Sequence, residues 1–234
     1  SPLHVGQFGG KWCSYSATPD LPYDQRLEDG GSLVFDSDPL VHSLDIVGAP
    51  FVDLDLVAER EVAMVAIRLS DISPDDKARR ISYGILNLTH RDSHENPSPL
   101  TPGQRYSIRV YLNHIAERLP KGHRFRIAIS TSYWPIAWPS PQPVRLSVYV
   151  SGSYLNLPIR QKDLAEDTQI RFAPAECARP VPTRQIIPKQ SNWIITHELA
   201  QDKYQLEVVK DDGRKFYENI NLDYSRKEDE RYSF

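Results

Sequence analysis

Apolar and polar residues alternate along much of this chain, as they do in strands that bury one face and expose the other. Val52, Leu54 and Leu56 alternate with Asp53 and Asp55 in "FVDLDLVAE". The same period of two recurs in residues 104–115, 123–132, 144–150 and 154–160. Residues 62–72, "VAMVAIRLSDI", are more continuously apolar and are expected to form a central strand. The pattern therefore predicts a largely antiparallel β protein.

Turn signals separate these runs. "SPDDKA" at 73–78 is expected to be a hairpin loop, and "PLTPGQ", "PKGH" and "SGS" are expected to be further turns. Asp212-Gly213 lies between two alternating runs and predicts another hairpin turn. The sequence predicts about nine to eleven strands. It predicts no helix longer than about ten residues, although a short helix around 161–167 fits. Many short strands joined by Gly/Pro turns indicate an all-β fold, either a β-sandwich or a jelly roll.

The chain is expected to form a single β-sandwich domain over residues 1–234. Residues 1–30 are irregular and are expected to lie along the surface, and 31–172 carry the main strands. Residues 173–190 are rich in proline and predict an extended crossing. Residues 191–234 supply the terminal strands and a charged tail.

Composition narrows the class of protein. A net charge of −3 and a pI of about 6.2 argue against a nucleic-acid binder. No run approaches about 18 apolar residues, so no membrane span is expected, and the first residues do not resemble a signal peptide. Cys13 and Cys177 are expected to be free thiols, which favours a cytoplasmic location. The chain begins Ser1-Pro2, which we interpret as a piece of a longer protein.

Residues 87–95, "NLTHRDSHE", concentrate the side chains of a hydrolase site: His90, Asp92, Ser93 and His94. Neighbouring residues of an extended segment point to opposite sides, and triads are assembled from distant parts of a chain. The chain also lacks a G-x-S-x-G motif. We therefore expect a strand that ends near Thr89, followed by a polar loop, and no catalytic residue.

A metal site is the second interpretation of this stretch. In an extended segment His90, Asp92 and His94 would share one face, but zinc usually needs a further ligand. The favoured interpretation is a loop in which Arg91 pairs with Asp92 or Glu95. The sequence predicts no metal and no cofactor.

Residues 132–143, "SYWPIAWPSPQP", hold the other notable side chains. Trp134 and Trp138 each precede a proline, which favours extended geometry. They could form an aromatic surface for a sugar or another protein chain, or they could pin the loop to its own core. Both alternatives stay open here.

The chain resembles the C-terminal, non-catalytic domain of the X-prolyl dipeptidyl-peptidase family, in the branch of CocE/NonD-type acyl hydrolases. The matching segments are "GGSLVFDSDPLVHSLDIVGAP" (30–50), "VAMVAIRLSDISPDDKARRISYGILNLTHR" (62–91) and "LTPGQRYSIRVYLNHIAERLPKGHRFRIAISTSYWP" (100–135). The resemblance implies a jelly-roll β-sandwich similar to galactose-binding folds. It also implies an upstream α/β-hydrolase domain that carries the catalytic residues, with this domain covering and stabilising it.

Several expectations follow from this resemblance and from the motifs. His90, Arg91 and Asp92 are expected on the same side as Trp134 and Trp138, where they would face the hydrolase domain. The alternative is a carbohydrate-binding module that uses the two tryptophans. A metal site at Asp53 and Asp55 is a third hypothesis. The sequence does not decide whether the chain forms a homo-oligomer.

Overall fold

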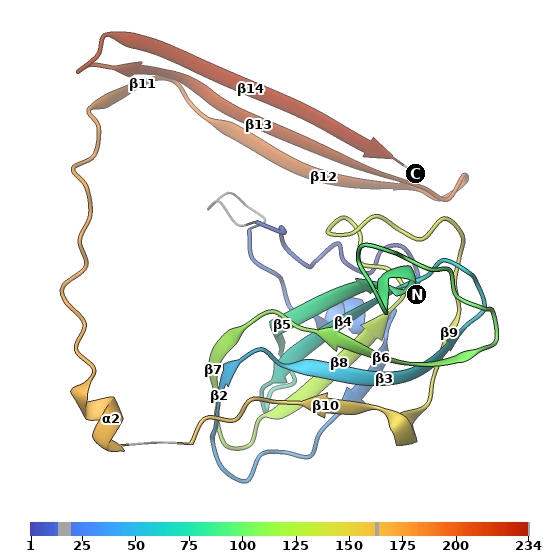
Figure 1. Cartoon of the computed structure of the whole chain (residues 1–234). Coiled ribbons are helices and arrows are strands. Elements are labelled where there is room, and N and C mark those ends of the chain that lie inside the picture. The colour runs from blue at the N-terminus through green and yellow to red at the C-terminus, as the bar shows by residue number, and fades with distance from the viewer. Residues whose placement is uncertain (14–19, 162–163, 234) are drawn as a thin grey trace. The chain divides into compact units, whose positions relative to one another are not determined.

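The chain folds into two compact units, in a computed structural model that describes residues 1–13, 20–161 and 164–233. Residues 1–12 and 21–161 form the first unit (Figure 1). The second unit consists chiefly of residues 164–233. Within the described residues, no helix combines the length and apolar character needed to cross a membrane. The single-domain boundary of 1–234 stays a prediction.

The first unit is a sandwich of antiparallel sheets, which confirms the all-β prediction. One sheet has the order β1-β8-β4-β5, formed by Leu33–Asp36, Arg124–Ser130, Met64–Ile72 and Ala78–Asn87. The other has the order β10-β3-β6, with β9 also paired to β3; these strands are Tyr154–Asn156, Phe51–Ala58, Arg105–Tyr111 and Leu146–Val148. A two-stranded sheet pairs β2 (Leu44–Gly48) with β7 (Ile115–Leu119), and single 3-10 turns occur at η1 (Leu88–His90) and η2 (Val150–Gly152).

The core lies between the two larger sheets, as the alternation predicts. Val52, Leu54 and Leu56 of β3 are at most 3% exposed, and they belong to the same apolar cluster as Ile67 and Leu69 of β4. Every residue of β4 is buried, so the continuously apolar run 62–72 contains a central strand, as predicted. Burying such side chains removes apolar surface from water and supplies the main stabilisation of the sandwich.

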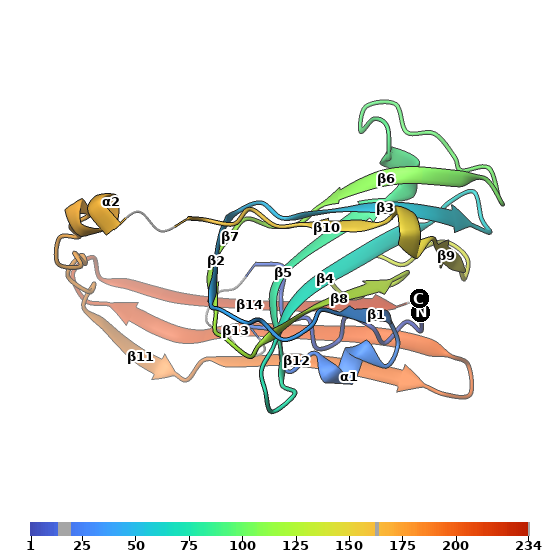
Figure 2. The ribbon, with the colours of Figure 1, turned by 90° about the horizontal axis from the view of Figure 1, so that it is seen from below.

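The sandwich is closed at one edge and open at the other. At the closed edge the backbone N–H of Asn113 donates to Tyr83 O at 3.0 Å, and Ser82 Oγ donates to Asn113 O at 2.7 Å. At the other edge, among the strands of the described residues, β1 pairs only with β8, and β10 pairs only with β3. Figure 2 shows β1 and β10 along this open side of the unit.

Residues 1–30 are more than a surface segment. They include the short helix α1 (Arg26–Asp29), and Val5 and Glu28 are completely buried against the outer face of the β4 sheet. The Arg68 side chain, also completely buried, donates to Glu28 Oε2 at 2.5 Å. Sequence periodicity missed this packing because it joins parts of the chain about 40 residues apart.

The second unit is one antiparallel sheet. It follows the short helix α2 (Leu164–Gln169), which lies near the short helix expected around 161–167. Its strands are β11 (Thr183–Ile187), β12 (Gln190–Glu198), β13 (Lys203–Tyr217) and β14 (Leu222–Ser233). β13 is central and pairs with the other three. Residues 173–182 have no regular secondary structure, but the predicted crossing 173–190 is too long because β11 lies within it.

The predicted hairpin turn at Asp212-Gly213 is wrong. β13 runs straight through these residues, and the pairing with β14 shifts register between Asp211 and Arg214. Gly213 has a φ of +65°, and its N–H donates to Asp211 Oδ1 at 2.8 Å. The two residues therefore form a β-bulge, which uses the same glycine geometry as a tight turn.

Candidate functional site

The loop after β5 contains the candidate hydrolase residues, and Ser93 and Asp92 make hydrogen bonds or ion pairs within this loop. Asn87 ends the strand, and its side-chain oxygen accepts from Thr89 N at 3.1 Å, which caps the short η1 turn. Leu88 is completely buried beneath the turn. The strand therefore ends near Thr89, as predicted.

Arg91 organises this loop. Its guanidinium donates to Leu88 O at 3.1 Å and to Ser98 O at 2.8 Å, and it lies 4.6 Å from the centre of the Tyr106 ring. The side chain is only 10% exposed, and its Nε lies 3.2 Å from Asp92 Oδ2, so the predicted pair with Asp92 is confirmed. Because one side chain bonds both ends of the loop, Arg91 fixes the loop's shape.

Ser93 is used in the same way. Its Oγ accepts from Glu95 N at 3.2 Å and from Asn96 N at 3.1 Å, which is a serine turn. The rings of His90 and His94 lie 5.5 Å apart, tilted by 39°. Across the described residues, no group of three or more His, Cys, Asp or Glu side chains could hold a metal ion. The arrangement is that of an ordered polar loop.

The two tryptophans have opposite environments. Trp134 is 1% exposed, whereas Trp138 is 61% exposed. The backbone at Gly6 passes so close to the Tyr133–Trp134 backbone that a Cβ at Gly6 would lie 2.4 Å from Trp134 O. The interpretation of both indoles as one aromatic surface is therefore corrected, because Trp134 is packed inside and only Trp138 offers a face to a ligand.

The loops that follow β5 and β8 begin at the same end of one sheet. Asn87, the last residue of β5, pairs with Met64 at the start of β4, and Ser130, the last residue of β8, pairs with Ala66. The loops that carry Asp92 and Trp138 thus begin on either side of one strand end, about two strand spacings apart. This placement agrees with the expectation that they share one side of the sandwich.

Asp53 and Asp55 do not form a metal site. Arg109 Nε donates to Asp53 Oδ1 at 2.7 Å from the opposite strand, and the guanidinium of Arg105 and the hydroxyl of Ser107 both donate to Asp55. The hydrogen bonds from Ser107 and Arg105 hold the pKa of Asp55 below its usual range. Because arginine already neutralises these carboxylates, they form cross-strand ion pairs of the kind that favours sheet pairing.

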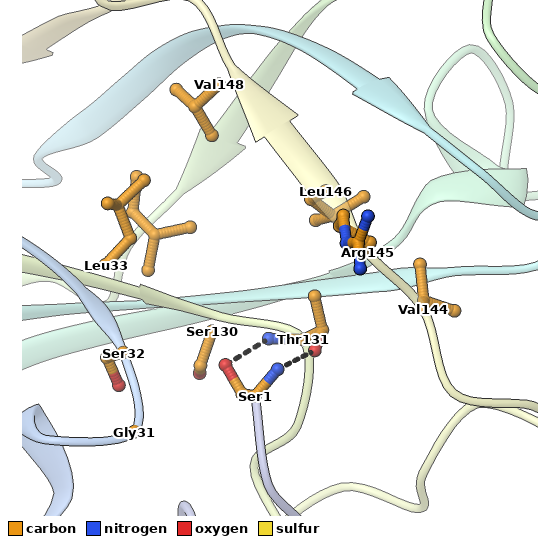
Figure 3. Close-up of a pocket in the computed structure, with 11 residues that line it drawn as sticks. Ser1, Gly31, Ser32, Leu33, Ser130, Thr131, Val144, Arg145, Leu146 and Val148 are labelled. Atoms are coloured by element: carbon orange, nitrogen blue, oxygen red, sulfur yellow. Dashed lines mark hydrogen bonds between the residues drawn. The ribbon is translucent and has the colours of Figure 1, made fainter.

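A cleft at the open edge was missed by sequence reasoning. Figure 3 shows Leu33, Leu146 and Val148 around it, with Ser130 and Thr131 below them in this view. The volume of the cleft is about 420 Å³. Its walls come from β1, β8 and the three-residue β9. The alternating run 144–150 predicted a strand here, but alternation does not show which strands lie next to one another, so the cleft could not be predicted from the sequence.

Comparisons with known proteins agree with this architecture. The model of a family described as the X-Pro dipeptidyl-peptidase C-terminal non-catalytic domain matches residues 1–171. Cocaine esterase of a Rhodococcus species is 23% identical over 116 residues, which are 49% of this chain and 20% of that protein. The chain spans about a fifth of the length of the curated relatives that it matches.

Solved structures give the same result. An α-amino acid ester hydrolase is similar with 26% identity and a TM-score of 0.54, over 59% of this chain and 27% of that one. An aminopeptidase from a marine sediment archaeon, Thaumarchaeota archaeon, has 19% identity, a TM-score of 0.54 and the same coverage, and shows the fold alone. With the family model covering residues 1–171, this chain belongs to the family of X-Pro dipeptidyl-peptidase C-terminal non-catalytic domains.

Proposed function

We propose that this chain is the β-sandwich domain of a larger serine hydrolase, and that it covers and stabilises an α/β-hydrolase domain of the same polypeptide. The observation that carries the proposal is the family match over residues 1–171, to a domain described as non-catalytic. The side chains of Ser93 and Arg91 agree with it, because both are bonded to their own loop. The substrate of the larger protein would be an ester or an X-Pro peptide.

The docking surface would be the end of the sandwich that carries Asp92 and Trp138. The Asp92 side chain is 74% exposed and Trp138 is 61% exposed, while the mostly buried Arg91 and Trp134 hold the two loops in place. An exposed tryptophan supported by a rigid loop suits the centre of a protein interface, where aromatic residues contribute most of the binding energy. His90, which is partly buried, would help to shape this surface.

The first test is catalytic. The 234-residue chain is expected to hydrolyse neither a p-nitrophenyl ester nor an X-Pro anilide, because the family model that matches it describes a non-catalytic domain. In the longer polypeptide that includes the hydrolase domain, turnover is expected, and Ser93→Ala should leave it unchanged. Turnover by the chain alone that Ser93→Ala abolishes would contradict the proposal.

The second test addresses the surface. In the longer polypeptide, Trp138→Ser is expected to lower the thermal stability of the hydrolase domain, since it removes an interface anchor. Tyr111→Ser is the matched control, because Tyr111 is 65% exposed on the other sheet. Equal effects of the two variants would show that the docking surface lies elsewhere.

A further inference from the structure

The open edge of the sandwich holds two adjoining cavities. The wider one measures about 420 Å³, and a narrower one of about 180 Å³ reaches between the sheets. Ile129 and Val148 line both, so the two spaces meet at these side chains. Protein cores are normally filled to the density of organic crystals, and cavities of several hundred cubic ångströms are typical of ligand sites.

The walls are mainly apolar. Phe35, Val52, Leu54 and Leu155 line the narrow part, and Leu33 and Leu146 line the wide part. Leu33 is 46% exposed, although it belongs to a strand of the sandwich. An elongated apolar group placed here would bury this surface, at about 25 cal/mol for each Å² removed from water.

The hydroxyl groups beside the cleft are already bonded within the protein. Ser130 Oγ donates to Ser132 O at 2.8 Å, and Ser32 Oγ donates to Glu28 O at 3.2 Å. Ser32 Oγ also accepts from Arg68 Nη2 at 2.8 Å. Thr131 is bonded to Ser1, as the dashed lines in Figure 3 show. These groups hold the rim together, so they do not determine which head group a ligand carries.

Arg145 differs from them. It lines the wide cavity beside Leu146, and its side chain is 78% exposed. Its guanidinium reaches Glu59 Oε1 only at 3.5 Å, the upper limit of a hydrogen bond. A guanidinium carries five N–H donors in a planar fork that matches a carboxylate, so Arg145 can bind an anionic head group at the mouth of the cleft.

We propose that this cleft binds a medium-chain monocarboxylate, with its hydrocarbon body between the two sheets and its carboxylate on Arg145. The site lies within the first unit, and the proposal does not rest on the proposed function. The two features that define the ligand are the apolar walls, which need a body of several carbons, and the guanidinium of Arg145 at the rim.

Octanoate is the probe, and 1-octanol is its uncharged counterpart. In a methyl NMR titration of the 234-residue chain, octanoate below its micelle concentration is expected to shift the methyl signals of Leu33, Leu146 and Val148 in a saturable manner. Arg145→Gln should weaken octanoate binding about fivefold, as expected for one exposed ion pair, and leave octanol binding unchanged. Val148→Phe, which fills the junction of the cavities, should weaken both ligands.

Matched variants separate this site from general surface effects. Arg118→Gln removes another exposed, ion-paired arginine and should not change either affinity. Val41→Phe adds the same bulk as Val148→Phe at a site 73% exposed, and should also have no effect. The proposal is wrong if Arg145→Gln and Arg118→Gln bind octanoate equally well, if octanol binds the wild type as tightly as octanoate, or if no saturable shift occurs at the cleft.

Discussion

At the scale of single residues, the buried pair of Arg68 and Glu28 joins residues 1–30 to the β4 sheet. Both side chains are completely buried, and Glu28 Oε1 also accepts from Gly6 N at 3.0 Å and from Phe8 N at 2.6 Å. Glu28→Gln should lower the free energy of unfolding by about 3 kcal/mol, because it leaves the Arg68 charge buried without its main partner. Urea unfolding followed by circular dichroism measures this.

A surface pair provides the control. Lys77 lies 2.8 Å from Asp75 Oδ2, with both side chains more than half exposed, so Lys77→Gln should cost less than about 1 kcal/mol. In the double variant Glu28→Gln/Arg68→Met the buried charge is gone, and part of the lost stability should return. Equal losses for Glu28→Gln and Lys77→Gln would show that the buried pair does not hold residues 1–30 in place.

Asp36 gives the chain a specific pH dependence. Two hydrogen bonds of 2.7 Å from Arg126, together with the charges of Arg126 and Arg124, lower the pKa of Asp36 below its ordinary value of 3.8. A depressed folded-state pKa stabilises the fold above the unfolded-state pKa, and this stabilisation is lost as the pH falls through the folded-state value. Asp36→Asn should therefore cost up to about 1 kcal/mol at pH 7 and progressively less below pH 3.8.

Urea unfolding of wild type and Asp36→Asn between pH 7 and pH 2 measures this effect. The exposed Asp38, two residues along the chain, provides Asp38→Asn as the control. A difference between wild type and Asp36→Asn that stays constant down to pH 2 would contradict the assignment.

Single residues also show which contacts can be predicted from a sequence and which cannot. The contact between Arg91 and Asp92 was predictable because it is local, and it is confirmed. The burial of Trp134 was not, because the segment that carries it packs against the backbone at Gly6, 128 residues earlier. Local pattern carries no information on which distant segment covers an indole.

At the scale of elements, the alternating pattern predicted most strands of the first unit, because one face of each sheet is buried. It failed at Asp212-Gly213, where a bulge and a hairpin need the same positive φ.

Gly213→Ala should open the C-terminal sheet, since the new Cβ would lie 2.1 Å from Ile187 O in a conformation that alanine disfavours. Hydrogen exchange should show faster exchange in β11 and β13, with β3 and β4 unchanged.

Gly103→Ala is the matched control for the bulge. Gly103 has a φ of +82°, and a Cβ there would meet no atom within 4 Å, so only the backbone cost of about 1 kcal/mol applies. Gly213→Ala should lower the free energy of unfolding by more than this amount, because it adds a steric clash. If both variants leave the exchange of β11 unchanged, the bulge is not required for the pairing of that strand.

At the scale of the whole molecule, the first unit holds its own apolar core, and an irregular, exposed segment, residues 170–182, precedes the C-terminal sheet. Alternation cannot say which strands share a sheet, so the sequence did not show that β11 to β14 pair only with one another among the named strands. A segment without hydrogen-bonded structure is the preferred site of proteolysis. The segment after α2 should therefore be cut before either sheet.

Phe172 is 93% exposed in this segment, so chymotrypsin should cut after it first, and trypsin should cut after the neighbouring Arg171. Phe172→Gly should abolish the chymotrypsin cut and leave the trypsin cut, which separates exposure of the segment from preference for one side chain. Mass spectrometry identifies the fragments.

Thermal unfolding of the fragment 1–171 should retain a cooperative transition, because the apolar cluster between its sheets lies entirely within residues 35–157. First cuts within β3 to β8, or loss of the transition on cleavage, would mean that the sandwich depends on the C-terminal sheet.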